Sequence, residues 1–421
     1  MYQLDFASLR RVLAARSRTT TRPVIVGTVW LLGIVSALTD VSSEMVSSIL
    51  PAYLFVHLQL SPIQFGLIDG LYQGVTAVAR LASGVLADRS GRYKSIAAIG
   101  YGLSAICKLG FLVAGSTWGA LAAVVSADRL GKGIRTAPRD ALISLATERA
   151  HLAAAFGVHR ALDTVGVVIG PLLAFALLRF VPGRFDAVFV SSFAIAIVGL
   201  AVLVLLVDDH ADPHRADAER DATRVRHLFN DTRFRAIALA ATVASFAVVS
   251  DAFLYLLLQW RAGFRTEMIP LLYVGTATSY LVLAAPLGRW ADRLGRGSTF
   301  IVGHLCMLAV YAAAAWLGVN TAGVVFCLIL HGAFYAATDG VLAALISDAS
   351  PAALRASSLS ALATSTSLAR LCGSVVVGFL WAWQGPGFVA IAGLGALTAS
   401  IVCSAIVLRT RPGDLARQEA S

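Results

Sequence analysis

Acidic, basic and histidine side chains lie inside the apolar stretches of this 421-residue chain, and their types and spacing could do chemistry. Asp40 and Glu44 lie four residues apart, so a helix places both of them on one face. Carboxylates and imidazoles in a poorly solvated setting can hold and release protons, and cations beside them can bind an anionic group. We select nine candidates from the first five apolar stretches: Asp40, Glu44, Asp69, Arg80, Lys108, Arg129, Lys132, His159 and Asp163.

Two interpretations of this charge density remain open. A charge at the centre of a bilayer costs about 2.5–3.5 kcal/mol even on lenient insertion scales, so these groups must pair or line water. The first interpretation is a buried salt-bridge network that fixes helix packing. Because buried ion pairs seldom add net stability, the second interpretation is favoured, namely a cavity that handles protons or a charged solute.

The first two of these carboxylates, Asp40 and Glu44, are the main candidates for proton coupling. Their Cβ atoms are expected about 5–6 Å apart on a helix. Two such carboxylates disfavour double ionisation, so one of them is expected to hold a proton near neutral pH. Asp163 with His159, and Arg129, are the predicted partners of the ionised form.

The elements that must position these residues are membrane-spanning helices. The chain is 58% hydrophobic and 14% charged, with a mean hydropathy of +0.77, which excludes an ordinary soluble globular protein. A span needs about 20 apolar residues, and twelve such segments lie between residues 24 and 408. The predicted organisation is a tail, a six-helix bundle, a linker, a second six-helix bundle and a tail, at residues 1–22, 23–207, 208–234, 235–408 and 409–421.

The distribution of Lys and Arg predicts the orientation in the membrane. When the connections between consecutive spans are numbered along the chain, only four Lys and Arg residues lie in the odd-numbered connections. The two tails and the even-numbered connections contain 22. Basic residues accumulate on the cytoplasmic side, so both termini and the 208–234 linker are predicted to be cytoplasmic, in a bacterial inner membrane. The net charge of +10 then reflects topology and contact with lipid, and it does not indicate nucleic acid as a partner.

Sequence motifs of several catalytic and energy-coupling classes are absent. The chain has no Gly-x-x-x-x-Gly-Lys-Ser/Thr, Gly-x-Ser-x-Gly or His-Glu-x-x-His pattern, which argues against an ATP-driven pump and against hydrolytic enzymes. The five cysteines lie in apolar segments without a Cys-x-x-Cys pair. We therefore expect no enzyme activity, no cofactor and no metal site.

A repeated motif indicates that the two halves are homologous. Gly-x-x-Ala-Asp-Arg-x-Gly-Arg occurs at 84–92 and again at 288–296, which is 204 residues later. Ala-Leu-Ile-Ser occurs at 141–144 and at 344–347, with an offset of 203. The shared offset favours a duplication over chance.

The tandem motif resembles the loop signature of the major facilitator superfamily between helices 2 and 3 and between helices 8 and 9. The resemblance implies an all-α membrane protein of twelve helices in two pseudo-symmetric six-helix bundles, which works by alternating access around a central cavity. It also implies a conformational latch in which the Asp of the loop pairs with basic residues and a helix end in one state. That role falls on eight residues: Gly84, Asp88, Arg89, Gly91, Arg92, Asp292, Arg293 and Arg296. Charges that only set the topology of a tight turn would explain the arginines but not the repeated Asp.

Two further patterns lie in the first half. Arg129-Leu-Gly-Lys-Gly133 resembles the Arg-x-x-x-Gly signature of helix 4 in the same superfamily. Gly166, Gly170 and Pro171 resemble its antiporter pattern in helix 5, although Ala174 replaces the last glycine. The two glycines are expected to admit a neighbouring helix closely, and the proline permits a bend. At the corresponding position the second half has Gly373-Ser374.

The function expected from these features is secondary transport of a small organic solute by a monomer, with protons and the lipid bilayer as its other partners. A proton-coupled exporter is favoured by the antiporter-like pattern. An importer by proton symport, of an anionic or zwitterionic solute, is an alternative that the same carboxylates would serve. A non-transporting membrane receptor on this fold is the third hypothesis. The segments around Asp40 and Arg135 resemble a bacterial facilitator subgroup and indicate no substrate.

Overall fold

The computed structural model describes residues 27–148, 151–208, 231–316, 320–350 and 354–409, and within these ranges the chain is helical. The first half contains α2 (Gly27–Pro51) with the π-helix η1 (Ala52–His57), α3 (Pro62–Ser90), α4 (Tyr93–Ala114), α5 (Trp118–Leu145), α6 (Leu152–Phe180) and α7 (Phe185–Leu206). The second half contains α9 (Thr232–Ala247), α10 (Asp251–Ala262), η4 (Thr266–Met268), α11 (Ile269–Leu294), α12 (Arg296–Trp316), α13 (Thr321–Ala349), α14 (Arg355–Gln384) and α15 (Pro386–Arg409). The predicted fold class, an all-helical membrane protein, is confirmed.

Ten segments of the described chain are long and apolar enough to cross a membrane. The helices α3 and α5, of 29 and 28 residues, have the necessary length but carry more charges. Since they lie between spanning helices, we treat them as spans too, which gives the twelve that were predicted. The predicted linker at 208–234 lies largely outside the described residues, and α9 begins at Thr232, three residues before the predicted second bundle.

The seventh span is interrupted, which the sequence analysis did not predict. Its two pieces, α9 and α10, are separated by Val248–Ser250. The backbone N–H of Val249 donates to the hydroxyl of Tyr311 at 2.7 Å. The Ser250 hydroxyl accepts from the N–H of Phe253 at 3.4 Å and so caps α10. Because these side chains replace the missing helical hydrogen bonds, the break is tolerated at membrane depth.

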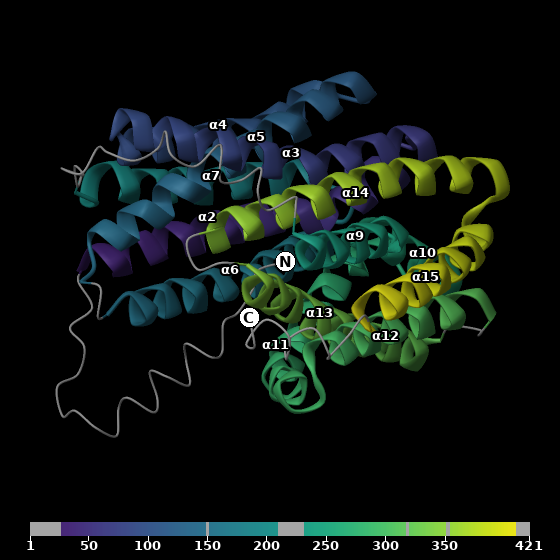
Figure 1. The fold of residues 1–421 in the computed structure, drawn as a ribbon. Coiled ribbons are helices and arrows are strands. Elements are labelled where there is room, and N and C mark those ends of the chain that lie inside the picture. The colour runs from purple at the N-terminus through teal and green to yellow at the C-terminus, as the bar shows by residue number, and fades with distance from the viewer. Residues whose placement is uncertain (1–26, 149–150, 209–230, 317–319, 351–353, 410–421) are drawn as a thin grey trace, which may run out of the picture.

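The two halves meet along two pairs of helices. Figure 1 shows α14 running along α3, and α11 packs against α6. We call the end where α2 passes into α3 the distal end, and the end that carries the 208–231 connection the linker end. Each pair therefore combines one helix from each half, in the pseudo-symmetric arrangement that a duplication predicts.

The apolar core is continuous between the halves only toward the distal end. One cluster includes Leu54 and Phe65 of the first half together with Phe253 and Trp381 of the second. The other clusters of the described chain stay within one half: one surrounds Leu32, and two lie in the second half. The distal end is therefore closed by apolar packing, and at the linker end the halves keep separate cores.

Candidate functional site

The acidic face of α2 lies directly against α6 at two glycines. A Cβ atom on Gly166 would lie 2.8 Å from the carbonyl oxygen of Ala37 and 2.9 Å from Cβ of Asp40. A Cβ on Gly170 would lie 2.6 Å from the carbonyl oxygen of Val41 and 2.8 Å from Cβ of Glu44. No side chain fits at these separations, so the two glycines allow the carboxylates of α2 to approach α6.

The cations that face the two α2 carboxylates come from α5. Arg135 Nη2 lies 3.4 Å from Asp40 Oδ1, and both side chains are almost fully buried. Lys132 Nζ lies 3.9 Å from Glu44 Oε1, and each of these side chains keeps 16% of its surface exposed. Ser47 donates to Glu44 Oε2 at 2.7 Å. The more exposed and looser pair is thus Glu44–Lys132, while Asp40–Arg135 is enclosed.

A second buried cluster joins α4 to α5. Lys108 Nζ lies 2.7 Å from Asp128 Oδ1, and Ser104 donates to the same oxygen at 2.6 Å. Arg129 Nε donates to Asp128 Oδ2 at 3.0 Å, and its guanidinium lies 4.1 Å from the centre of the Tyr72 ring. Arg129 pairs with the adjacent residue, Asp128, and it also interacts electrostatically with Glu44 of α2. Its predicted partnership with the α2 carboxylates therefore stays a prediction.

The sequence analysis also left out residues that belong to this charged network. Besides Asp128, these are Arg135 and Arg139, which lie farther along α5. Arg139 Nη1 donates to Ser36 at 2.8 Å, and Arg139 Nη2 lies 2.8 Å from Asp140. A usable signal exists in the sequence: Asp128, Lys132, Arg135 and Arg139 follow the i, i+4, i+7, i+11 spacing of one helical face.

Asp163 and His159 lie side by side in the interior of the first half. Their side chains are each 1% exposed, and His159 Nε2 lies 3.6 Å from Asp163 Oδ2, which is too long for a hydrogen bond. Neither carboxylate oxygen of Asp163 has a hydrogen-bond partner among the described residues. Asp163 is close enough to Asp40 for the two carboxylates to repel each other. The structure thus brings Asp40 next to Asp163 across the α2–α6 contact.

Two of the nine candidates lie on α3, outside the contacts described above. Asp69 is buried, but it faces the second half, where Ser374 of α14 donates to its Oδ2 at 2.6 Å. Arg80 is exposed on α3. The remaining seven candidates gather between α2, α4, α5 and α6.

The predicted latch residues are only partly described. The side chains of Asp88 and Arg89 lie outside the described part of the structure. Gly91 ends α3 with φ of +66°, a left-handed conformation that glycine adopts freely. In the second copy, Arg296 forms an ion pair with Asp348 of α13 and donates to the carbonyl oxygen of Ala344 at 3.4 Å. The motif therefore contacts a helix end within its own half, and the latch role stays a prediction.

One glycine and three charged residues remain to be placed in the two copies of the motif. Gly84 leaves room for Ala137 of α5, whose Cβ would lie 3.6 Å from an added Cβ. The side chains of Arg92, Asp292 and Arg293 are exposed at the linker end.

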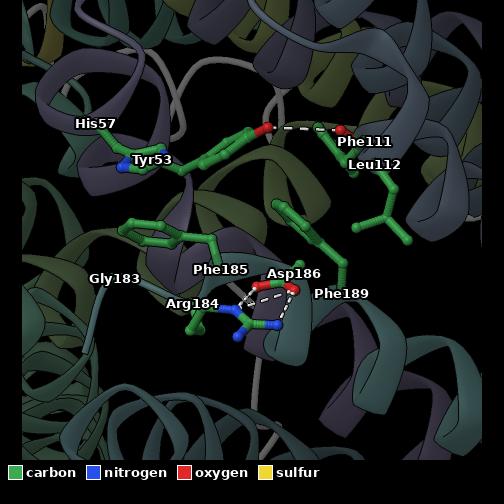
Figure 2. A pocket seen from close by; sticks show the side chains of 9 residues that line it. All are labelled: Tyr53, His57, Phe111, Leu112, Gly183, Arg184, Phe185, Asp186 and Phe189. Carbon is green, nitrogen blue, oxygen red and sulfur yellow. Dashed lines mark hydrogen bonds and ion pairs between the residues drawn. The ribbon is translucent and has the colours of Figure 1, made fainter. Parts of the chain in front are cut away.

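A cavity of about 310 Å³ lies elsewhere, at the distal end of the first half (Figure 2). Figure 2 shows aromatic rings around it, including Tyr53, Phe185 and Phe189, and the Arg184–Asp186 ion pair at one side. The hydrogen bond and ion pair with Asp186 raise the pKa of the exposed Arg184 guanidinium. No predicted site residue lines this cavity.

The second half carries its own polar groups. Asp251, at the start of α10, accepts from the hydroxyl of Tyr335 at 2.6 Å and lies 3.3 Å from His331 Nε2. A cavity of about 30 Å³ near His304, Asp339 and Arg370 has room for a water molecule. Within the described residues, no three His, Cys, Asp or Glu side chains are placed to hold a metal ion.

Chemically, the first half can exchange protons and bind charge in one place. Its enclosed Asp40–Asp163 pair and its more exposed Glu44–Lys132 pair each include one carboxylate of α2. Permanent cations on α5 hold these acids at membrane depth, where isolated charges are costly.

Comparisons with known proteins agree with this architecture. The sequence profile of the Major Facilitator Superfamily matches residues 32–273 and 262–421. An uncharacterized MFS-type transporter of Methanocaldococcus jannaschii is 29% identical over 363 residues, which cover 84% of this chain and 88% of that protein. An uncharacterized protein of Mycobacterium tuberculosis is 27% identical over 374 residues, which cover 86% of this chain and 88% of that protein.

Among solved structures, a variant of the nucleoside transporter NupG superimposes with a TM-score of 0.79 at 15% identity, over 91% of this chain and 100% of that one. At that identity the likeness shows the fold alone. The profile covers almost the whole chain, and the two halves meet along two helix pairs, α3 with α14 and α6 with α11. The chain therefore belongs to the major facilitator superfamily, and it is a multi-pass membrane protein and a secondary transporter.

Proposed function

We propose that this transporter moves a small organic solute by alternating access and couples the movement to protons, as an exporter that works by antiport. The observation that carries the proposal is the burial of Asp163 next to Asp40, with neither Asp163 oxygen hydrogen-bonded within the described chain. A salt-bridge network built only for packing would be expected to satisfy such a carboxylate.

The proton step belongs to Asp40 and Asp163. Two carboxylates that face each other in a poorly solvated interior disfavour double ionisation, so the pair shares a proton. Arg135 compensates one negative charge at 3.4 Å from Asp40. Lys132 and Arg139 also act electrostatically on Asp40. Loss of the shared proton then adds a negative charge to this buried cluster, which changes the free energy of the α2–α6 contact. This pair replaces Asp40 with Glu44 as the proposed proton carrier, because Glu44 accepts a hydrogen bond from Ser47 at 2.7 Å, whereas neither Asp163 oxygen has a hydrogen-bond partner among the described residues.

The solute step belongs to Glu44 and Lys132. Their 3.9 Å separation is longer than that of a charge-assisted hydrogen bond, and both side chains remain 16% exposed. A solute that carries both an anionic and a cationic group can replace this loose pair with two shorter contacts. We therefore favour a zwitterionic solute, with its anionic group on Lys132 and its cationic group on Glu44.

The proposed direction rests on the Gly166, Gly170 and Pro171 pattern of α6, which resembles that of antiporters. Import by symport is the alternative, because the same carboxylates can carry a proton in the direction of the solute. A receptor that does not transport is disfavoured, because titratable groups at membrane depth cost free energy and are retained where they have a function in transport.

We infer that the linker end is cytoplasmic in a bacterial inner membrane, because the basic residues concentrate there. Both termini would then be cytoplasmic, and the present conformation, closed at the distal end, faces the cytoplasm. A monomer suffices, since the solute path would run between the two halves of one chain. The eight latch residues would act at the linker end when that end closes.

The proposal is tested with purified protein in liposomes. A panel of zwitterionic, anionic and cationic solutes is first screened by ligand-induced thermal shift, since a ligand that binds the folded state raises its apparent stability. The strongest binder is then followed in liposomes with an imposed pH gradient. Antiport predicts solute accumulation on the side with the higher proton concentration. Accumulation on the opposite side would show symport, and binding without flux would show a receptor.

Lys132→Gln tests the solute step. Because a hydrogen bond to a charged group contributes about 1.5–3 kcal/mol, the Kd of a zwitterionic or anionic solute is expected to rise about tenfold or more. Isothermal titration with the solute found in the screen measures this change. Lys94→Gln is the matched control, since the Lys94 ammonium donates to the carbonyl oxygen of Val204 away from the network. An unchanged Kd in Lys132→Gln would remove this residue from the solute site.

A further inference from the structure

Asp69 does not take part in the charged network, and its surroundings indicate a separate role. Its side chain is 6% exposed on α3, and the hydroxyl of Ser374 on α14 donates to Asp69 Oδ2 at 2.6 Å. The side chains of Ser250, at the break in the seventh span, and of Gln73 lie close enough to act on this carboxylate. Asp69 of the first half is therefore bonded to α14 of the second half and lies near the break in the seventh span.

The helices around this bond are packed without space for further side chains. A Cβ atom on Gly66 would lie 2.7 Å from the carbonyl oxygen of Ser374 and 3.0 Å from Cα of Gly378. A Cβ on Gly70 would lie 2.9 Å from the carbonyl oxygen of Leu371. The Asp69–Ser374 bond is thus formed at a backbone-to-backbone crossing of α3 and α14, where water is excluded.

Four aromatic rings from both halves cover the distal side of this crossing. Phe65 lies 4.8 Å from Phe253, Phe253 lies 5.6 Å from Trp381, and Phe55 lies 5.4 Å from Trp381, between ring centres. Packing of apolar rings alone opposes separation of the two halves, but it depends little on how α3 and α14 are aligned. The buried hydrogen bond to a carboxylate adds a directional contact that forms only in one register of α3 on α14.

A comparison of the two repeats shows that only one of the two pseudo-symmetric helix pairs, α3 with α14, has the residues for this bond. With the offset of 203 residues, Ser374 corresponds to Pro171, and with the offset of 204, Asp69 corresponds to Tyr273. The pseudo-symmetric contact of α6 with α11 therefore has a proline, which has no side-chain donor, where α14 has the serine hydroxyl. The departure of the second half from the Gly-Pro pattern is what supplies the donor for Asp69.

We propose that Asp69 and Ser374 form a positioning lock that holds the distal end closed and that breaks in each cycle when this end opens. Asp69 acts through α14, without contact to the solute. The inference rests on transport by alternating access, and it is independent of the proton carrier and of the direction. It assigns to one side-chain hydrogen bond, which is buried, charge-assisted and formed by one of the two helix pairs, a share of the stability of a distal end that apolar packing also closes.

The lock is tested by a distance measurement across the distal end. Spin labels are attached to cysteines introduced at Ser116 and Ala322, which are exposed at the distal ends of the two halves, in a variant without the five native cysteines. Pulsed electron-spin distances are recorded for the whole protein in lipid nanodiscs. Because the lost bond involves a charged group, Ser374→Ala and Asp69→Ala are expected to raise the ratio of open to closed distal end about tenfold.

Two further variants separate the lock from general loosening. Ser400→Ala is the matched control, since Ser400 is buried and its hydroxyl has no hydrogen-bond partner among the described residues. It should keep the parent distribution. Asp69→Asn keeps an acceptor for Ser374 and is expected to restore most of the closed population that Asp69→Ala loses.

An unchanged distribution in Ser374→Ala would overturn the lock, and so would an equal shift in Ser400→Ala. These distances do not depend on any pH gradient. Failure of the lock is therefore distinguishable from failure of proton coupling, which is measured by flux.

Discussion

Asp163→Asn is expected to abolish solute accumulation driven by a pH gradient, while solute binding and downhill exchange survive. Asparagine has nearly the same shape, but it cannot carry the proton that we propose Asp40 and Asp163 to share. Because neither Asp163 oxygen is hydrogen-bonded within the described residues, the substitution should cost little stability. The accumulation ratio in liposomes with an imposed pH gradient is expected to fall at least about tenfold, since Asp40 alone lacks the second carboxylate with which it would share the coupling proton.

Asp163 is a better test of coupling than its neighbour on α2. Asp40→Asn would also leave Arg135, 3.4 Å away and almost fully buried, without its charged partner. Uncompensated buried charges destabilise strongly, so loss of activity there would be ambiguous. Solute counterflow, which needs no net proton movement, should remain near the parent rate in Asp163→Asn.

Asp186→Asn provides the matched control for this substitution. Asp186 pairs with Arg184 at the distal end, where both side chains are about half exposed or more, and such surface pairs contribute little to stability. It should leave accumulation unchanged. If Asp163→Asn still accumulates solute with the parent pH dependence, the charged network serves packing, and the proton carrier lies elsewhere.

Gly170→Leu is expected to cause the largest structural effect. Even a Cβ at this position would lie 2.6 Å from the carbonyl oxygen of Val41 and 3.0 Å from the backbone nitrogen of Met45, neither of which can rotate away. The leucine must therefore push α2 and α6 apart, which separates the carboxylates of α2 from Asp163. Overpacking of this kind destabilises by about 3 kcal/mol, and transport should be lost. Thermal unfolding in detergent and flux in liposomes measure the two effects.

The same substitution can be made on the same helix where there is space. A Cβ on Gly157 would have no heavy atom of the described chain within 4 Å, so Gly157→Leu should keep both stability and flux near the parent values. Gly373→Leu, at the repeat-related position, should have a stability and a flux between those of Gly170→Leu and Gly157→Leu. Its added Cβ would meet the carbonyl oxygen of Phe246 at 2.7 Å and otherwise nothing closer than 3.5 Å. Normal flux in Gly170→Leu would show that the tight α2–α6 contact is not required.

The sequence by itself determined the membrane helices, their number and the duplication. Hydropathy is a local property, so a run of about 20 apolar residues indicates a span whatever lies beside it. The copies at 84–92 and 288–296 indicate homologous halves for the same reason, because their match needs no knowledge of contacts. Helical spacing also placed Asp40 with Glu44, and Asp163 with His159, on common faces.

Only the tertiary structure decided which helix faces pack against one another. The spacing of residues along α5 does not predict that Arg129 pairs with Asp128 and that Arg135 pairs with Asp40. These pairings depend on how α4 and α2 pack against α5. The break at Val248–Ser250 combines a local signal, the Ser250 cap of α10, with a hydrogen bond to the hydroxyl of Tyr311, which only the tertiary structure brings to this segment. Asp69 shared a helical face with cavity candidates, yet its partner Ser374 is 305 residues away. Helix periodicity fixes the direction of a side chain within its own helix, and packing between helices alone fixes what that side chain touches.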